Sequence, residues 1–175
     1  FCTPRCFAGQ MPALWQFGPV TVADHRRDDS IAAIARRILA HAPPRFALAG
    51  ISMGGYISLE LVRQAPERVR KLALICTSAR PDTPEQTDRR RQQIELAQKG
   101  RFADIAKLAF PLMFHPDHHG DASLREAVTT MAAETGAEAF VRQQTAIIGR
   151  IDSRPHLSAI PCPTLVIAAE NDEVI

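Results

Sequence analysis

The chain contains 175 residues, of which 46% are hydrophobic, and it carries a formal net charge of +2. This length and apolar content predict one soluble domain with a sizeable core. The charge balance argues against a general polyanion binder, because the basic residues are scattered and the one cluster, at 89–91, is flanked by polar residues as on a solvated helix face. We therefore expect no nucleic-acid partner.

No apolar run approaches the roughly 18 residues that a membrane span requires, and no secretory leader is visible at the start. The four cysteines lack the CxxC spacing of zinc and redox sites; they are Cys2, Cys6, Cys76 and Cys162. We expect reduced thiols in a cytoplasmic protein with no membrane partner. The chain begins with phenylalanine and stops soon after a strand-like run, so we also expect both ends to be cut relative to a complete domain.

In chain order, strand-like and helix-like patterns alternate. The β-branched run at 19–23 predicts a buried strand, and apolar residues at helical spacing within 28–44 predict a helix capped by Asp29 or Ser30. The next elements are predicted as a strand at 46–50, a helix at about 53–64, and strands at 71–79 and 163–169. This alternation predicts an α/β fold with a mainly parallel sheet, flanking helices and right-handed crossovers.

The segment at 80–161 is too long for a simple crossover and predicts several helices. Thr83 and Gln86 match a capping box at the start of the first of them. Further helices are expected near 102–110, after Asp121, and at about 137–148. We interpret this segment as a helical cap inserted over the sheet. The core is then discontinuous, with its first part at 1–79 and a strand and acid loop at 162–175.

The stretch "RFALAGISMGGYISLELV", residues 45–62, places a serine between glycines where a strand must turn into a helix. Gly50, Ser52 and Gly54 form G-x-S-x-G, the pattern of a sharp turn that holds one side chain at its apex in a strained conformation. A side chain at either flanking position is expected to collide with the neighbouring backbone, so glycine is required there. The pattern marks Ser52 as a candidate nucleophile.

Two other interpretations fit the same turn. The serine could simply cap the helix that follows it. A phosphate-binding loop is the second, but no lysine follows the second glycine and the G-x-G-x-x-G spacing is absent. The strand-like run before the serine and the helix-like run after it favour a catalytic serine.

A serine hydroxyl is a poor nucleophile at neutral pH and needs a histidine base that is oriented by a carboxylate. In this type of fold the chain order is serine, acid, histidine. Asp172 is the best candidate acid, because it lies a few residues beyond a predicted strand, where open α/β sheets gather their active-site loops. Asp82 is the reserve acid, and Glu170 lies too close to the strand.

The stretches "LAGISMGGYISLELVRQAPERVRKLALICTSARPDTPEQTDRRR" and "RIDSRPHLSAIPCPTLVIAAENDEVI" resemble the α/β-hydrolase superfamily. Within it they are most similar to the small esterase branch that includes pimeloyl-ACP methyl ester carboxylesterase. The resemblance spans nearly the whole chain from about Thr3. It implies that Ser52 is the nucleophile, that the Met53 amide is one oxyanion donor, and that Asp172 is the triad acid.

Two features of that family are missing from these residues. Members carry a His-Gly or Pro-Gly strand end before the second oxyanion donor, and this chain begins at about that point, so Phe1 or Cys2 is expected to supply the donor. Members also carry a histidine after a further strand. No histidine of this chain follows Asp172, so the base is expected beyond Ile175. The absent upstream strand is expected to leave the sheet open between the first two predicted strands.

A histidine-rich loop allows a metal site. His115, His118 and His119 lie beside Asp117 and Asp121 and could bind zinc or nickel. A polar loop between helices explains them equally well, and no second ligand pair has regular spacing. We therefore predict no metal site.

Three apolar residues of the predicted cap could contact a substrate. Phe110, Met113 and Phe140 could line an acyl pocket under the cap, or they could form the cap's own core. The sequence alone leaves both interpretations open.

Together these features predict a serine hydrolase that cleaves a carboxylic ester or thioester with an apolar acyl part, without a cofactor. Two alternatives stay open. The same triad could serve cofactor-free peroxidation, acyl transfer or carbon–carbon bond hydrolysis, and a hydrolase-like module could bind a ligand without chemistry. We expect a small-molecule substrate, and the sequence does not determine the oligomeric state.

Overall fold

The computed structural model describes residues 2–172 and 174 of the chain. Within these residues the strands are β1 (Phe46–Ile51), β2 (Val69–Ile75) and β3 (Thr164–Ile167). The α-helices are α1 (Met11–Leu14), α2 (Ile31–His41), α3 (Met53–Gln64), α4 (Pro84–Gln98), α5 (Phe102–Met113), α6 (Ala122–Thr135) and α7 (Ala137–Ile148). Short 3-10 segments are η1 (Pro4–Phe7), η2 (Trp15–Phe17), η3 (Pro66–Arg68), η4 (Pro116–His118) and η5 (Arg154–Ala159).

The three strands form a parallel sheet in the order β1-β2-β3. Leu48 pairs with Leu72, which pairs with Thr164, so equivalent residues of the three strands point to the same face. β2 ends at Ile75 because Cys76 turns the chain with a φ of 40°. The expected α/β fold with a parallel sheet is confirmed, and the carboxyl ends of all three strands lie at one edge.

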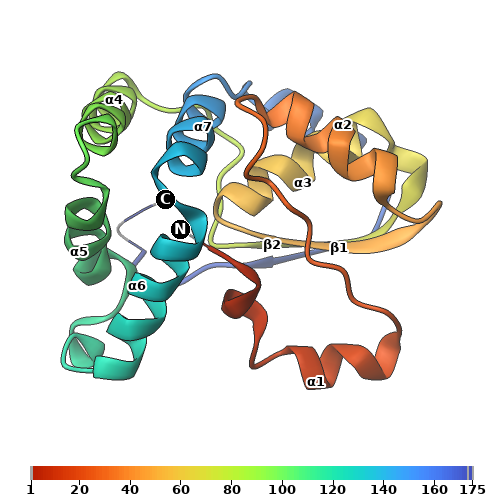
Figure 1. Ribbon diagram of the computed structural model, residues 1–175. Coiled ribbons are helices and arrows are strands. Elements are labelled where there is room, and N and C mark those ends of the chain that lie inside the picture. The colour runs from red at the N-terminus through yellow and green to blue at the C-terminus, as the bar shows by residue number, and fades with distance from the viewer. Residues whose placement is uncertain (1, 173, 175) are drawn as a thin grey trace.

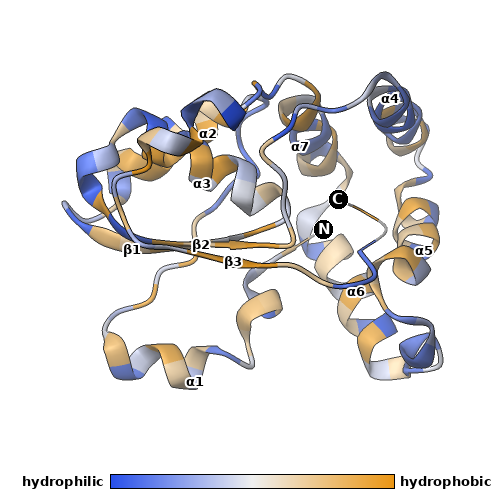
Figure 2. Cartoon of the chain, turned by 180° about the vertical axis from the view of Figure 1, so that it is seen from behind, coloured by the Kyte–Doolittle hydropathy of each residue, from blue (hydrophilic) through white to orange (hydrophobic). Residues whose placement is uncertain are grey.

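Helices α2 and α3 cover one face of the sheet (Figure 1). The Ser30 hydroxyl, one of the two expected caps, caps α2 by accepting a hydrogen bond from the Ala33 N–H at 3.2 Å. Ile34 of α2, Leu61 of α3 and Ala146 of α7 are buried in one apolar cluster beside these helices. Figure 2 shows the strands as largely hydrophobic; α3 buries part of this surface on β2, where Leu59 and Leu72 share a cluster, whereas the residues of β3 are exposed.

The prediction of a strand at 19–23 is wrong. These residues belong to no strand, and Val22 is 38% exposed. In Figure 1 this part of the chain runs from α1 toward α2 across the direction of the strands. A strand is stabilised by ladder hydrogen bonds and cross-strand packing. In the described chain β1 pairs only with β2, so the segment forms no ladder with β1 and lacks the pairing that would make it a strand.

Helices α4 to α7, residues 84–148, form a helical region beside the sheet (Figure 1). Thr83 and Gln86 make the predicted capping box, with the Gln86 N–H donating to Thr83 Oγ1 at 3.2 Å and the Thr83 N–H donating to Gln86 Oε1 at 3.0 Å. Asp121 caps α6 through the N–H groups of the next turn. All four expected helices are confirmed. In the part of the chain that the structure describes, no helix combines the length and apolarity of a membrane span.

Candidate active site

Ser52 forms the turn between β1 and α3 with a φ of 51° and a ψ of −117°, a conformation that few residues with a side chain adopt. Its N–H donates to the Ile75 carbonyl of β2 at 2.9 Å. Its carbonyl accepts from the Gly55 N–H at 2.9 Å and from the Thr77 hydroxyl at 2.8 Å. These bonds fasten the backbone of Ser52 to the end of β2 and hold the strained turn.

The glycines of the turn have different roles. A Cβ at Gly50 would collide with the Gly54 carbonyl group and the Ser58 hydroxyl, so a side chain is excluded there as expected. Gly54 has open space where a Cβ would lie, so the collision expected at this position is wrong. The steric limit falls instead on Gly55, whose Cβ would overlap Thr77. The double glycine at 54–55 is the sequence signal for this contact.

The first turn of α3 offers backbone donors beside Ser52. The Met53 N–H is the first of the helix and has no intrahelical acceptor, and in the described chain no other group accepts from it. It is therefore free to bind an anion, because the N-terminus of a helix attracts negative charge. Phe1, the expected second donor, lies outside the described residues. Its alternative Cys2 is half-buried, and no described contact places its amide beside Ser52.

The predicted acid loop follows β3 at the same edge of the sheet. Ile75 pairs with Ile167, and the Cys76 N–H donates to the Ile167 carbonyl at 2.8 Å, so the chain leaves β3 beside the end of β2. Asp172, five residues further on, is partly buried and accepts a hydrogen bond from the Val174 N–H at 2.9 Å. The strand register thus gathers the Ser52 turn and the Asp172 loop at one edge.

The charge of Asp172 also acts on a side chain of the helix that follows Ser52. Burial raises the pKa of the Tyr56 hydroxyl; the positive charges of Arg150 and Arg90 oppose this rise, and the negative charges of Asp82 and Asp172 add to it. Tyr56 lies one helical turn after Ser52. Asp172 is thus one of four charged groups whose charge acts on this side chain.

The reserve acid Asp82 has a different environment. Its Oδ1 accepts from Arg150 at 2.6 Å and its Oδ2 from Arg90 at 2.8 Å, with the carboxylate 2% exposed. Because both oxygens are bound to arginines, Asp82 is not available to orient a histidine. Asp172 therefore remains the candidate acid, on the loop that follows β3.

The histidines of this chain take no part in the Ser52 turn. In the described residues no histidine side chain hydrogen-bonds to the Ser52 hydroxyl. His119 Nε2 lies 2.8 Å from the Phe114 carbonyl and 3.1 Å from the Pro111 carbonyl, and His115 Nδ1 accepts from the Asp117 N–H at 3.4 Å. These contacts fasten the loop at 114–119. Among the residues that the structure describes, no three His, Cys, Asp or Glu side chains are grouped to hold a metal ion.

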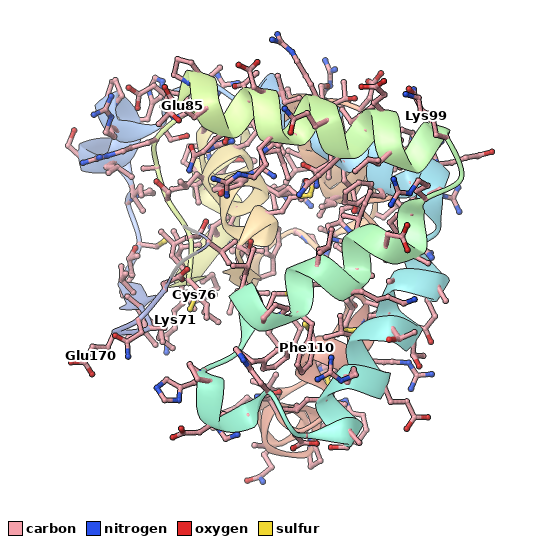
Figure 3. The ribbon with its side chains drawn as sticks, turned by 90° about the vertical axis from the view of Figure 1, so that its left-hand side faces the viewer. Lys71, Cys76, Glu85, Lys99, Phe110 and Glu170 are labelled. Carbon is pink, nitrogen blue, oxygen red and sulfur yellow. The ribbon has the colours of Figure 1, made fainter. Side chains whose placement is uncertain are left out.

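Two of the three apolar residues proposed for a substrate pocket are buried among helices. Phe110 is 2% exposed, packs on Val128 and Met131 of α6, and lies within the helical region in Figure 3. Phe140 is 3% exposed, in a separate cluster with Ile105. Met113 is 39% exposed at the end of α5. Burial of Phe110 and Phe140 against neighbouring helices favours the interpretation that they form the core of the helical region, whereas the exposed Met113 stays a predicted pocket residue.

Comparisons with known proteins agree with this geometry. The sequence profile of the alpha/beta hydrolase fold matches residues 7–175. RutD of Azorhizobium caulinodans, provisionally named a carbamate hydrolase, is 30% identical over 162 residues, which cover 90% of this chain and 58% of the relative. This chain spans 58% to 61% of the length of the curated relatives it matches.

Solved structures show the same fold. A thermophilic esterase from Thermogutta terrifontis superposes with a TM-score of 0.71 at 25% identity, over 84% of this chain and 55% of that one. A hydrolase from Pseudomonas aeruginosa PA01 superposes with a TM-score of 0.80 at 22% identity, over 95% of this chain and 67% of that one. The profile match over nearly the whole sequence and the strand–turn–helix geometry at Ser52 lead to one conclusion: the chain belongs to the α/β hydrolase family.

Proposed function

We propose that the protein is a serine hydrolase that cleaves a carboxylic ester or thioester, with Ser52 as its nucleophile. The observation that carries the proposal is the conformation of Ser52, whose φ of 51° places a hydroxyl-bearing residue at the apex of a strand-to-helix turn. Strain of this kind costs roughly 1 to 3 kcal/mol and persists where function requires it. A serine that only caps a helix would accept a hydrogen bond from that helix, and the Ser52 side chain makes no such bond.

In the proposed mechanism the Ser52 hydroxyl attacks the carbonyl carbon while a histidine accepts its proton. The Met53 N–H stabilises the oxyanion, and Asp172 orients the histidine and stabilises its charged form. The histidine then returns the proton to the leaving group, and water releases the acyl enzyme by the same steps. Side chains supply the nucleophile and every proton transfer, so the reaction needs no cofactor.

We further propose that the helical region is a cap over the site. It is inserted between β2 and β3, and the carboxyl ends of these strands adjoin the Ser52 turn and lead to the Asp172 loop. Residues inserted there are placed to cover the reacting groups and to contact the part of the substrate that does not react. A cytoplasmic location stays a prediction, supported by four cysteines that are all free thiols.

The relatives' names extend the range of substrates to test. RutD is provisionally named a carbamate hydrolase, and a structural neighbour with 24% identity is an enol-lactonase from Burkholderia xenovorans LB400. Carbamates and enol lactones carry an acyl carbon that the same serine could attack. A panel of short and long esters, a thioester, a carbamate and an enol lactone therefore separates these substrate classes. Peroxidation, acyl transfer and carbon–carbon bond hydrolysis use the same nucleophile and need separate assays.

A fluorophosphonate probe tests the nucleophile directly. In the protein at its full natural length we expect covalent labelling of Ser52, loss of labelling in Ser52→Ala, and unchanged labelling in Ser158→Ala, which alters an exposed serine of η5. Mass spectrometry of the labelled peptide identifies the modified residue. Labelling that survives Ser52→Ala would place the nucleophile elsewhere. A folded protein that is never labelled would favour a module that binds without chemistry.

A further inference from the structure

The chain passes between the sheet and the helical region twice, once after β2 and once after α7. The two passages are bound to each other. The Ser153 N–H donates to the Ala79 carbonyl at 2.8 Å, and Arg150 Nε donates to the Arg80 carbonyl at 3.0 Å. The entry and the exit of the helical region therefore form one paired connection.

A buried ion cluster lies at this connection. The two oxygens of Asp82, on the first passage, accept hydrogen bonds from Arg150 on the second passage and from Arg90 on α4. Arg90 also donates to Gln144 Oε1 on α7 at 2.8 Å. The side chains of Asp82 and Arg150 are 2% and 6% exposed. One carboxylate thus ties both passages to two helices of the region.

The same cluster contacts the helix that follows the candidate nucleophile. The guanidinium carbon of Arg150 lies 4.3 Å from the centre of the Tyr56 ring, a distance typical of a cation–π contact. Tyr56 is 6% exposed and lies one turn of α3 after Ser52. Asp82 carries one negative charge for two arginines, and the ring face of Tyr56 favours the remaining positive charge. The cluster therefore connects the helical region to α3.

Because the ion cluster is buried, the loss of any one partner destabilises the whole cluster. A guanidinium group offers its donors in a rigid planar fork, so Arg150 bonds to Asp82 and to backbone carbonyls in one geometry only. Removing one partner from a buried ion pair leaves a charge without water or counter-charge, which is strongly unfavourable. The cluster thus adds a directional polar contact to the apolar packing of α7 on α3, and both contacts hold the helical region against α3.

We propose that Asp82 is a positioning residue that, through Arg90 and Arg150, sets the orientation of the helical region over Ser52 and so the fit of the substrate's acyl part. The expected effect on the fit of the acyl part rests on the proposed function, whereas the expected effect on the orientation of the helical region does not. Asp82 acts through the arginines, because both its oxygens are bound to them. Its effect is selective: long acyl groups that reach the helical region depend on the cluster, and short ones do not.

The test compares Asp82→Asn, which keeps the size of the side chain and removes its charge, with the unaltered protein at full natural length. KM and kcat are measured for p-nitrophenyl acetate and p-nitrophenyl octanoate. We expect the KM for octanoate to rise about tenfold, while kcat for acetate changes by less than about threefold. Asp82→Glu, which keeps the charge, should restore part of the octanoate KM. Amide exchange at Ser153 should accelerate in Asp82→Asn, and this readout needs no catalysis.

Asp88→Asn is the matched control, since Asp88 is an exposed aspartate of α4 paired with Arg91, and it should change none of these values. An equal loss of kcat on both esters with normal Ser153 exchange would overturn the proposal and place Asp82 in the chemistry. A lower melting temperature with an unchanged ratio of the two KM values would reduce Asp82 to a structural role and also overturn it.

Two further outcomes concern a variant that does not fold and a protein without esterase activity. If Asp82→Asn does not fold, Arg90→Gln replaces it, because Arg90 is 20% exposed and the pair of Asp82 with Arg150 survives its loss. A smaller octanoate effect in the same direction is then expected, and no effect would contradict the proposal. If neither ester is cleaved and Ser52 is never labelled, the proposed function fails, while the Ser153 exchange rate still decides whether Asp82 orients the helical region.

Discussion

The Thr77 side chain occupies the space into which a Cβ of Gly55 would project. The same side chain donates its hydroxyl hydrogen to the Ser52 carbonyl at 2.8 Å. The loop after β2 is thus pressed directly against the first turn of α3. This contact, rather than the second glycine of G-x-S-x-G, limits the side chains that the elbow tolerates.

Gly55→Ala should therefore destabilise the protein, and Gly54→Ala should not. The added methyl group at Gly55 must displace Thr77 and strain the backbone of Ser52, at a cost of about 1 to 3 kcal/mol typical of overpacking. At Gly54 the methyl group enters open space, and alanine favours a helix by up to about 1 kcal/mol over glycine. Chemical denaturation of both variants measures the difference. Equal stability of the two variants would contradict this account of the elbow.

Asp172→Asn should leave the fold intact and lower turnover by up to about 10⁴-fold, because the histidine would lose the charge that fixes its tautomer and orientation. Steady-state ester hydrolysis measures the loss, and circular dichroism checks the fold. Glu170→Gln is the matched control, since Glu170 is exposed and projects away from the rest of the molecule in Figure 3. A nearly silent Asp172→Asn would remove this residue from the proposed triad.

Phe110→Ala should act on stability rather than on substrate choice. Phe110 packs against Phe114 with ring centres 4.9 Å apart and lies under the guanidinium of Arg125. Truncating a phenylalanine this deeply buried costs about 3 to 5 kcal/mol. Leu108→Ala, at a position that is 69% exposed, should change stability by less than about 0.5 kcal/mol. A stable Phe110→Ala with altered preference among acyl chain lengths would restore the pocket interpretation.

Glu60 should contribute to stability in a pH-dependent way. Burial acts to raise the pKa of this carboxyl group, but hydrogen bonds from Arg63 and Gln64 outweigh it and hold the pKa below its ordinary value. A carboxylate with a lowered folded-state pKa stabilises the protein above its unfolded-state pKa of about 4.3, and this stabilisation is lost as the pH falls through the folded-state pKa.

Glu60→Gln should accordingly lower the melting temperature at pH 7, and its difference from the unaltered protein should shrink as the pH falls below about 4.3. Glu67→Gln, at an exposed site in η3, is the control and should have little effect at either pH. A difference between Glu60→Gln and the unaltered protein that does not depend on pH would mean that the charge of Glu60 is not what stabilises the fold.

Local signals in the sequence were sufficient to predict most of the helices and strands. The helix caps at Ser30 and Thr83 act within one turn, so residues three positions apart determine where α2 and α4 begin. The elbow is also local, because Gly50, Ser52 and the flanking strand and helix patterns are adjacent in the chain. The position of Asp172 after the last strand followed from the chain order of the family that the sequence resembles.

The tertiary structure alone decided which side chains meet across the chain. The run at 19–23 has the composition of a strand, but pairing with a neighbour makes a strand, and sequence patterns do not reveal whether that neighbour is present. The sequence allows Asp82 as a triad acid. In the structure its two oxygens accept hydrogen bonds from Arg90 and Arg150, which lie 8 and 68 residues away in the chain. Burial of Phe110 and Phe140 likewise depends on helices packed against them. The sequence by itself determined the fold class and the Ser52 turn, because these follow from short-range sterics and hydrogen bonding. Long-range packing determined the roles of the remaining residues, because a charge or an aromatic ring acquires its function from the partners that the fold brings to it.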